Sequence, residues 1–132
     1  MRLVLLAFAL NIRRRLRFAP DTAAPGTTGG GSAGHCAAAA VIVRSELGGD
    51  FVSVRVDGRS HWYNRVGGFD IDVTGDQFGR HAVQVGANLY PGSRVRHPSE
   101  LTSETLWRAR ELARRSGFRA LTGGDCGGES DG

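Results

Sequence analysis

Lysine is missing from this chain of 132 residues, so all 17 of its basic side chains are arginine. With 13 acidic residues they leave a net charge of +4 and a pI near 10.0. Such a balance suggests nucleic acid as a partner. However, the arginines are scattered outside residues 13–17, and aromatic residues do not alternate with them as in a protein that binds single strands. We therefore expect no nucleic-acid partner.

Cysteine is scarce, because the chain has only Cys36 and Cys126, the second in a glycine-rich tail. Two cysteines so placed do not make the disulfide framework of a secreted domain. No C-x-x-C or H-x-x-x-H spacing is present. Zinc held by Cys36, His35, His61 and Asp72 is thus a weak alternative, and we predict no metal and no cofactor. A free nucleophilic thiol needs a reducing compartment, so we expect the cytoplasm.

Long apolar runs are also missing, and the run over residues 3–10 is too short to span a bilayer. It is followed by arginines and has no small-residue cleavage site, so it does not fit an export signal. Apolar residues spaced by three and four continue along one helical face: Leu5, Phe8, Ile12 and Leu16. We expect residues 1–18 to form an amphipathic helix that packs on the domain, and we expect no membrane partner.

Composition divides the remaining chain into three parts. Residues 19–34 are rich in glycine and proline and are typical of a linker, whereas residues 122–132 lack apolar side chains and are expected to be disordered. Between them, the apolar content supports one small core, so residues 35–121 are expected to form a single α+β domain. Its last strand is expected at 82–85, followed by a loop over 88–98.

A final helix is indicated by a capping pattern. Thr102 is a good N-cap residue, and Leu101 and Leu106 flank it as a hydrophobic staple. We expect this helix to end near Gly117.

Cys36 opens an alanine-rich segment that ends at Gly48-Gly49, with strong helix formers first and a glycine stop last. This pattern places Cys36 in the first turn of a helix. There the unsatisfied backbone N–H groups and the helix dipole stabilise a thiolate. A lone cysteine near an alanine-rich helix is more often a small core residue, so further evidence is needed.

The segments 61–66 and 69–73 are typical of strands, and Gly67-Gly68 between them fits a two-residue hairpin loop. With this loop, Val66 faces Phe69, and the polar side chains collect on one side of the hairpin. That side carries His61, Tyr63, Arg65, Asp70, Asp72 and Thr74. A slip of one residue would move the whole strand to the other face.

On this register Asp72 is the diagonal neighbour of His61 and lies within reach of a hydrogen bond, whereas Asp70 lies opposite Arg65 as an ion-pair partner. We therefore predict a catalytic triad in which Cys36 attacks, His61 transfers the proton and Asp72 orients the imidazole.

Donors for an oxyanion are less defined, since no glutamine precedes Cys36 as in papain-type enzymes. The backbone N–H of Cys36 is available, with help from His35 or Gln77. Asn64 and Trp62 are further candidates for positioning substrate.

Several short motifs in order along the chain resemble the YunG-like bacterial proteins, over about residues 21–78. They are Gly34-His35-Cys36-Ala37, Gly48-Gly49, Ser60-His61 with the aromatic residues and Asn64 that follow, Asp72-Val73-Thr74 and Gln77-Phe78. The residue before the cysteine, often glutamine in this group, is His35 here. The resemblance implies a link to papain-like cysteine hydrolases. It also implies an α+β fold in which N-terminal helices, one carrying the cysteine, pack on a small antiparallel sheet with a C-terminal helix.

The predicted function is that of a hydrolase or acyl transferase acting on an amide or isopeptide carbonyl in a protein or peptide-like substrate. Peptidase, amidase, deamidase and transglutaminase all use such a triad, and the sequence leaves these four and the oligomeric state open. The alternative is a non-catalytic binding module of the same fold, in which Cys36, His61 and Asp72 form a buried polar cluster.

Overall fold

The computed structural model describes residues 1–119 and 121, and its α+β class agrees with the prediction. The residues 122–132 and Cys126 lie outside this range. The helices are α1 (Arg2–Arg15), α2 (Cys36–Leu47) and α3 (Ser103–Ser116), with the short 3-10 turns Pro20–Thr22, Gly75–Phe78 and Pro98–Glu100. The strands are β1 (Asp50–Val56), β2 (Arg59–Val66), β3 (Phe69–Asp72), β4 (Gln84–Gly86) and β5 (Arg94–Arg96).

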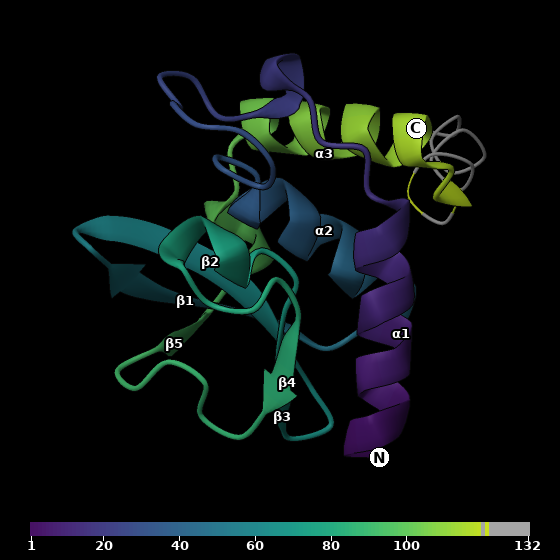
Figure 1. The fold of residues 1–132 in the computed structure, drawn as a ribbon, viewed down its shortest axis with the longest axis vertical. Coiled ribbons are helices and arrows are strands. Elements are labelled where there is room, and N and C mark those ends of the chain that lie inside the picture. The colour runs from purple at the N-terminus through teal and green to yellow at the C-terminus, as the bar shows by residue number, and fades with distance from the viewer. Residues whose placement is uncertain (120, 122–132) are drawn as a thin grey trace.

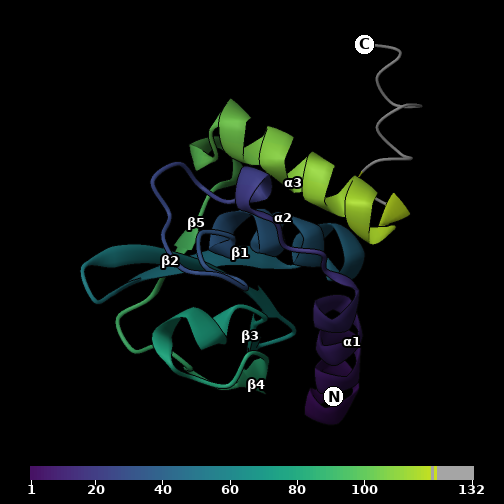
Figure 2. The same ribbon diagram turned by 45° about the horizontal axis from the view of Figure 1, so that its top comes forward.

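The strands form one antiparallel sheet in the order β4-β3-β2-β1-β5. Helix α2 lies against one face of this sheet, and α3 packs on the side of α2 that faces away from the strands (Figures 1 and 2). Helix α1 stands at the side of the sheet where β3 and β4 lie. The main core therefore surrounds α2, with Ile42, Phe51 and Ile71 between α2 and the sheet and Leu112 between α2 and α3.

Helix α1 packs on the domain through one face, but its exposed side also carries apolar residues, among them Leu3 and Leu10, and its buried stripe differs from the predicted one at one position. Leu5, Ile12 and Leu16 are buried, whereas Phe8 is 52% exposed and Ala9 is fully buried in its place. Positions 5, 9, 12 and 16 are spaced by four, three and four, so they share one face, and Phe8 lies about 100° away from Ala9. Among the described residues no helix has the length and apolar character needed to cross a bilayer.

The β2–β3 hairpin has the predicted register. Val66 pairs with Phe69, Arg65 with Asp70 and Asn64 with Ile71. Gly67 and Gly68 have φ values of 58° and 84°, which a tight hairpin turn requires at both central positions. Regular pairing ends at Asn64 and Ile71, so His61 lies beyond the last paired residues of the two strands.

The face of the sheet opposite α2 has its own apolar cluster, formed by Val52, Tyr63 and Tyr90. Tyr90 comes from the segment between β4 and β5. The predicted loop over 88–98 is wrong in its second half, because Arg94–Arg96 forms the edge strand β5 along β1. This segment has three residues and one apolar side chain, so it is too short to show the alternation of apolar and polar residues by which a strand is recognised.

The remaining boundaries follow the capping signals. Thr102 accepts a hydrogen bond from the backbone N–H of Thr105 at 3.1 Å, and α3 ends at Gly117 with φ 81°. Residues 19–34, expected as a linker, pack against the domain, since Thr22 and Ser32 are buried. The Ser32 hydroxyl donates to Asp76 at 2.6 Å and ties this segment to the turn after β3.

Candidate functional site

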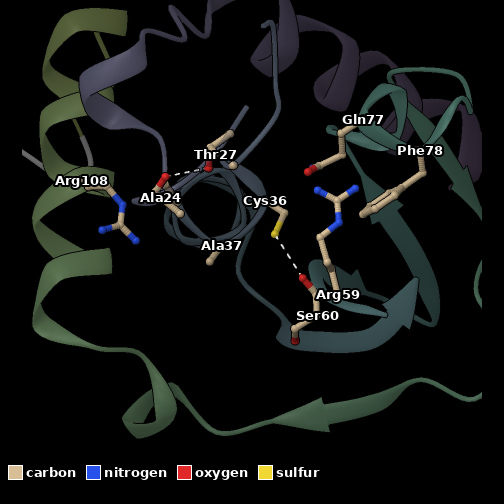
Figure 3. Close-up of a pocket in the computed structure, with 11 residues that line it drawn as sticks. Ala24, Thr27, Cys36, Ala37, Arg59, Ser60, Gln77, Phe78 and Arg108 are labelled. Atoms are coloured by element: carbon tan, nitrogen blue, oxygen red, sulfur yellow. Dashed lines mark hydrogen bonds between the residues drawn. The ribbon is translucent and has the colours of Figure 1, made fainter. Parts of the chain in front are cut away.

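Cys36 is the first residue of α2 and lines a cleft of about 190 Å³ (Figure 3). The cleft is bounded by the segment before α2, the first turn of α2, the start of β2, the turn Gly75–Phe78 and α3. The Cys36 Sγ lies 3.8 Å from the carbonyl oxygen of Ser60. The thiol is therefore accessible from the cleft and sits at the positive end of the α2 dipole.

His61 is fully buried behind this cysteine. Its Nε2 donates to Asp72 Oδ2 at 2.9 Å, whereas Nδ1 has no hydrogen-bond partner among the described residues. Burial would lower the pKa of His61, but Asp72 and then Cys36 outweigh it and raise this pKa to about 9. The raised pKa favours the imidazolium at neutral pH, and the second nitrogen has no hydrogen-bond partner among the described residues.

Asp72 is fixed by donors on both of its oxygens. Oδ1 accepts from the Thr74 backbone N–H at 3.0 Å and from the Thr74 hydroxyl at 3.4 Å. Oδ2 accepts from His61 and from the hydroxyl of Tyr90. A buried carboxylate that is saturated in this way cannot rotate, so it holds the imidazole in one orientation. The His61–Asp72 contact predicted from the register is present.

Tyr90 is the part of this network that sequence reasoning missed. Its hydroxyl accepts from Gln84 Nε2 at 3.2 Å while it donates to Asp72. Burial, followed by the negative charge of Asp72, raises the pKa of Tyr90, so the hydroxyl stays protonated as a donor. No local motif marks Tyr90, which lies eighteen residues beyond Asp72 in the chain.

Three aromatic rings surround the His61 imidazole. Tyr63 stacks at 5.8 Å, and Phe78 and Tyr90 present their edges at 4.8 and 5.1 Å between ring centroids. These rings exclude water from the imidazolium, and the stacked face of Tyr63 favours a cation. Phe78 also lines the cleft, so it separates His61 from solvent on the side where Cys36 is reached.

A family model described as YunG protein matches residues 17–115. The chain belongs to the YunG protein family. The matched range contains Cys36, His61, Asp72 and Tyr90 but none of α1. No curated protein and no solved structure matches the chain. The predicted family resemblance is thereby confirmed.

His35, a candidate oxyanion donor, lies outside the cleft in this YunG family member. Its Nδ1 donates to the Ala33 carbonyl at 3.0 Å, and its Nε2 lies 2.8 Å from the Thr22 hydroxyl. The ring packs on Phe18, and burial lowers the pKa of His35. The side chain is therefore occupied in anchoring the segment before α2, which corrects the expectation that it helps to form an oxyanion hole.

Asn64 and Trp62 also lie outside the cleft. The Asn64 side-chain amide donates to the Ala40 carbonyl at 2.9 Å and so joins the strand that carries His61 to the helix that carries Cys36. Trp62 packs edge-on against Phe51, at 5.7 Å between centroids. Neither side chain is placed to touch a substrate at the thiol. Asn64 instead holds α2 and β2 together.

Gln77 is the one side-chain donor among these candidates that lines the cleft. Its amide nitrogen donates to the Thr74 carbonyl at 3.2 Å, which leaves one N–H of the amide group free.

The four side chains considered as zinc ligands do not come together, because His35 points away from Cys36 and His61. Within residues 1–119 and 121 no group of three or more potential ligands gathers.

Proposed function

We propose that this protein is a papain-like cysteine hydrolase or acyl transferase that acts on an amide or isopeptide carbonyl. The observation that supports it is the pairing of an accessible thiol at a helix N-terminus with a buried imidazole whose pKa is raised. One nitrogen of that imidazole is committed to Asp72, and the other is free beside Cys36. An imidazolium next to a cysteine favours the thiolate, which is the nucleophilic form.

In the first step the Cys36 thiolate forms a C–S bond to the carbonyl carbon, and the carbonyl electrons move to oxygen. The backbone N–H of Cys36 and the free N–H of Gln77 are the donors available to this oxyanion. His61 then gives the proton on Nδ1 to the leaving nitrogen as the C–N bond breaks. A thioester and a free amine result.

In the second step water or an acceptor amine attacks the thioester. Neutral His61 takes the proton of this nucleophile, the C–S bond breaks, and the thiolate is restored beside the imidazolium. Asp72 keeps Nε2 protonated throughout, so Nδ1 is the nitrogen that gains and loses the proton. We propose a protein or peptide-like substrate and, because the thiol must stay reduced, a cytoplasmic location.

The test is the rate at which iodoacetamide alkylates Cys36 in a Cys126→Ala background. At pH 6.5 a free thiol with a pKa of about 8.5 is almost entirely protonated, so we expect Cys36 to react about tenfold faster than N-acetylcysteine. His61→Gln should abolish this advantage, whereas His35→Gln, a matched change at the other buried histidine, should keep it. A rate equal to that of N-acetylcysteine and unchanged by His61→Gln would overturn the proposal.

That outcome would favour the second candidate, a binding module without catalysis. The complete burial of His61 and Asp72 and the saturation of both Asp72 oxygens are the features that favour it. In such a module the cluster fastens β2, β3 and the segment of Tyr90 to one another.

A further inference from the structure

Two guanidinium groups stand on opposite sides of Cys36 in the cleft. Arg59 comes from the start of β2, and Arg108 comes from α3 (Figure 3). Arg59 lies over the ring of Phe78 at 5.3 Å, and an Arg108 amine donates to the Thr105 hydroxyl at 3.1 Å. Neither group has a carboxylate partner among the residues that the structure describes. Both charges are therefore available to a ligand.

Five other arginines have a carboxylate within 3 Å, namely Arg13, Arg65, Arg96, Arg114 and Arg115. Among residues 1–119 and 121, no aspartate or glutamate lines the cleft. Asp76, next to Gln77 in sequence, is held by both amines of Arg13 at 2.9 Å, which lowers the pKa of Asp76 to about 2. Arg108 also lines a neighbouring depression that contains Asp21 and Glu104, but neither carboxylate forms an ion pair with it.

The positive surface continues past the cleft. A second depression of about 240 Å³ shares Ser60 with the cleft and is lined by Arg55 and Arg94. The Ser60 carbonyl, between the two depressions, lies 3.8 Å from the Cys36 Sγ. A chain bound along this surface would pass Cys36 between Arg59 and Arg108 and then meet the arginines of β1 and β5. An extended acidic ligand fits this arrangement better than one small anion.

We propose that the substrate is an acidic peptide or isopeptide, with a carboxylate within reach of Arg59 or Arg108 when its scissile carbonyl lies at Cys36. The position of the scissile carbonyl at Cys36 rests on the proposed function, whereas the acidic character of the ligand does not. A peptide is favoured over RNA because Phe78 is the one aromatic residue that lines the cleft. Arg59 already lies over its ring, so the cleft offers no row of aromatic side chains on which successive bases could stack.

The first experiment compares two alkylating reagents that differ only in charge. In the Cys126→Ala protein, the ratio of the iodoacetate rate to the iodoacetamide rate at Cys36 is divided by the same ratio for N-acetylcysteine. We expect a quotient of about ten, because unpaired positive charge concentrates the anionic reagent. Arg59→Gln with Arg108→Gln should bring it close to one. The control pair Arg2→Gln with Arg14→Gln, exposed positions in α1 with the same change in net charge, should leave it unchanged.

The second experiment measures binding and does not depend on a reactive thiol. A tetramethylrhodamine-labelled peptide of alternating Glu and Gly, and the same peptide with Gln, are titrated with the full chain carrying Cys36→Ala, by fluorescence anisotropy. We expect the Glu peptide to bind about tenfold more tightly, and the difference to vanish in the Arg59→Gln, Arg108→Gln protein. Lysine at both positions should restore most of it, which excludes misfolding as the cause.

Each result has a distinct meaning. An unreactive Cys36 together with selective binding of the Glu peptide would refute the catalytic proposal and leave the acidic ligand standing. A reactive Cys36 with equal binding of the two peptides and an alkylation quotient near one would overturn the acidic substrate. Tighter, arginine-dependent binding of a single-stranded RNA oligonucleotide than of the Glu peptide would overturn the choice of a peptide.

Discussion

His35 and His61 are both buried, at 1% and 0% exposure, yet their surroundings act on them in opposite directions. His35 faces a backbone carbonyl and a hydroxyl, and burial lowers its pKa. His61 faces the carboxylate of Asp72 and the thiol of Cys36, which raise its pKa to about 9 against the effect of burial. Neutral partners cannot offset the cost of burying a cation, whereas a fixed anion can. The same residue type is therefore an anchor at one end of α2 and a charged group beside the cleft.

The strongest way to break this comparison is Asp72→Asn, which gives His61 neutral surroundings like those of His35. Loss of one partner of a buried charged pair should lower the free energy of unfolding by about 4 kcal/mol, measured by urea denaturation at pH 7. Asp21→Asn is the control, because the Asp21–Arg115 ion pair is exposed and should matter little. If the Asp72→Asn protein were as stable as the parent, the charge of Asp72 would not be what stabilises the protonated His61.

A rise in pH above neutrality tests the contribution of His61 to stability apart from that of His35, and it does so with Asp72 unchanged. Between pH 6.5 and 9 native His61 keeps a proton that the unfolded chain has lost, so stability should fall as pH rises. A shift from 6.5 to about 9 corresponds to about 3 kcal/mol. Urea denaturation across this range should show the loss in the parent protein and not in His61→Gln. An equal slope in both proteins would contradict the raised pKa.

Tyr90→Phe sharpens the comparison by removing one donor from Asp72 while it keeps the ring. The buried carboxylate oxygen loses a hydrogen bond, so we expect a loss of about 1–2 kcal/mol in the free energy of unfolding. The ring contacts with His61 and Tyr63 should persist, and near-UV circular dichroism checks this. An unchanged stability would mean that Tyr90 contributes packing alone.

The smallest expected effect lies on the acid side and belongs to His35. Because its native pKa is lowered, the unfolded chain takes up a proton below pH 6.5 that native His35 refuses, so stability should fall as pH falls. In the His35→Gln protein, the free energy of unfolding should fall less between pH 7 and acid pH than it does in the parent. The His61→Gln protein should show the same fall as the parent. The two variants thus act on opposite sides of neutrality.

Local signals were sufficient for the parts of the site that depend on neighbouring residues. The alanine-rich run after Cys36 placed the start of α2, and the Gly67-Gly68 turn fixed which residues face one another across β2 and β3. From that register alone, Asp72 rather than Asp70 was expected at His61, and Asp70 at Arg65. These predictions hold because a two-residue turn leaves a hairpin one register.

Other parts of the site depend on segments far apart in the chain, and there the sequence offered little. Tyr90 reaches Asp72 from a connection with no regular structure, and Arg108 reaches the cleft from the last helix. The sequence suggests His35 as an oxyanion donor, but its side chain instead contacts Thr22 and Ala33, which depends on how residues 19–34 pack. The catalytic roles of Cys36, His61 and Asp72 stay predictions until the alkylation rates are measured.

By itself the sequence determined the helix that begins at Cys36, the hairpin register and the contact between His61 and Asp72. Each follows from backbone preferences and hydrogen-bond geometry within a few residues of a turn or cap. Tertiary structure decided which histidine has a raised pKa, which tyrosine holds the carboxylate and which arginines line the cleft of the thiol. Those outcomes depend on burial and on the charges that packing brings close together, and neither is set by the residues adjacent in sequence.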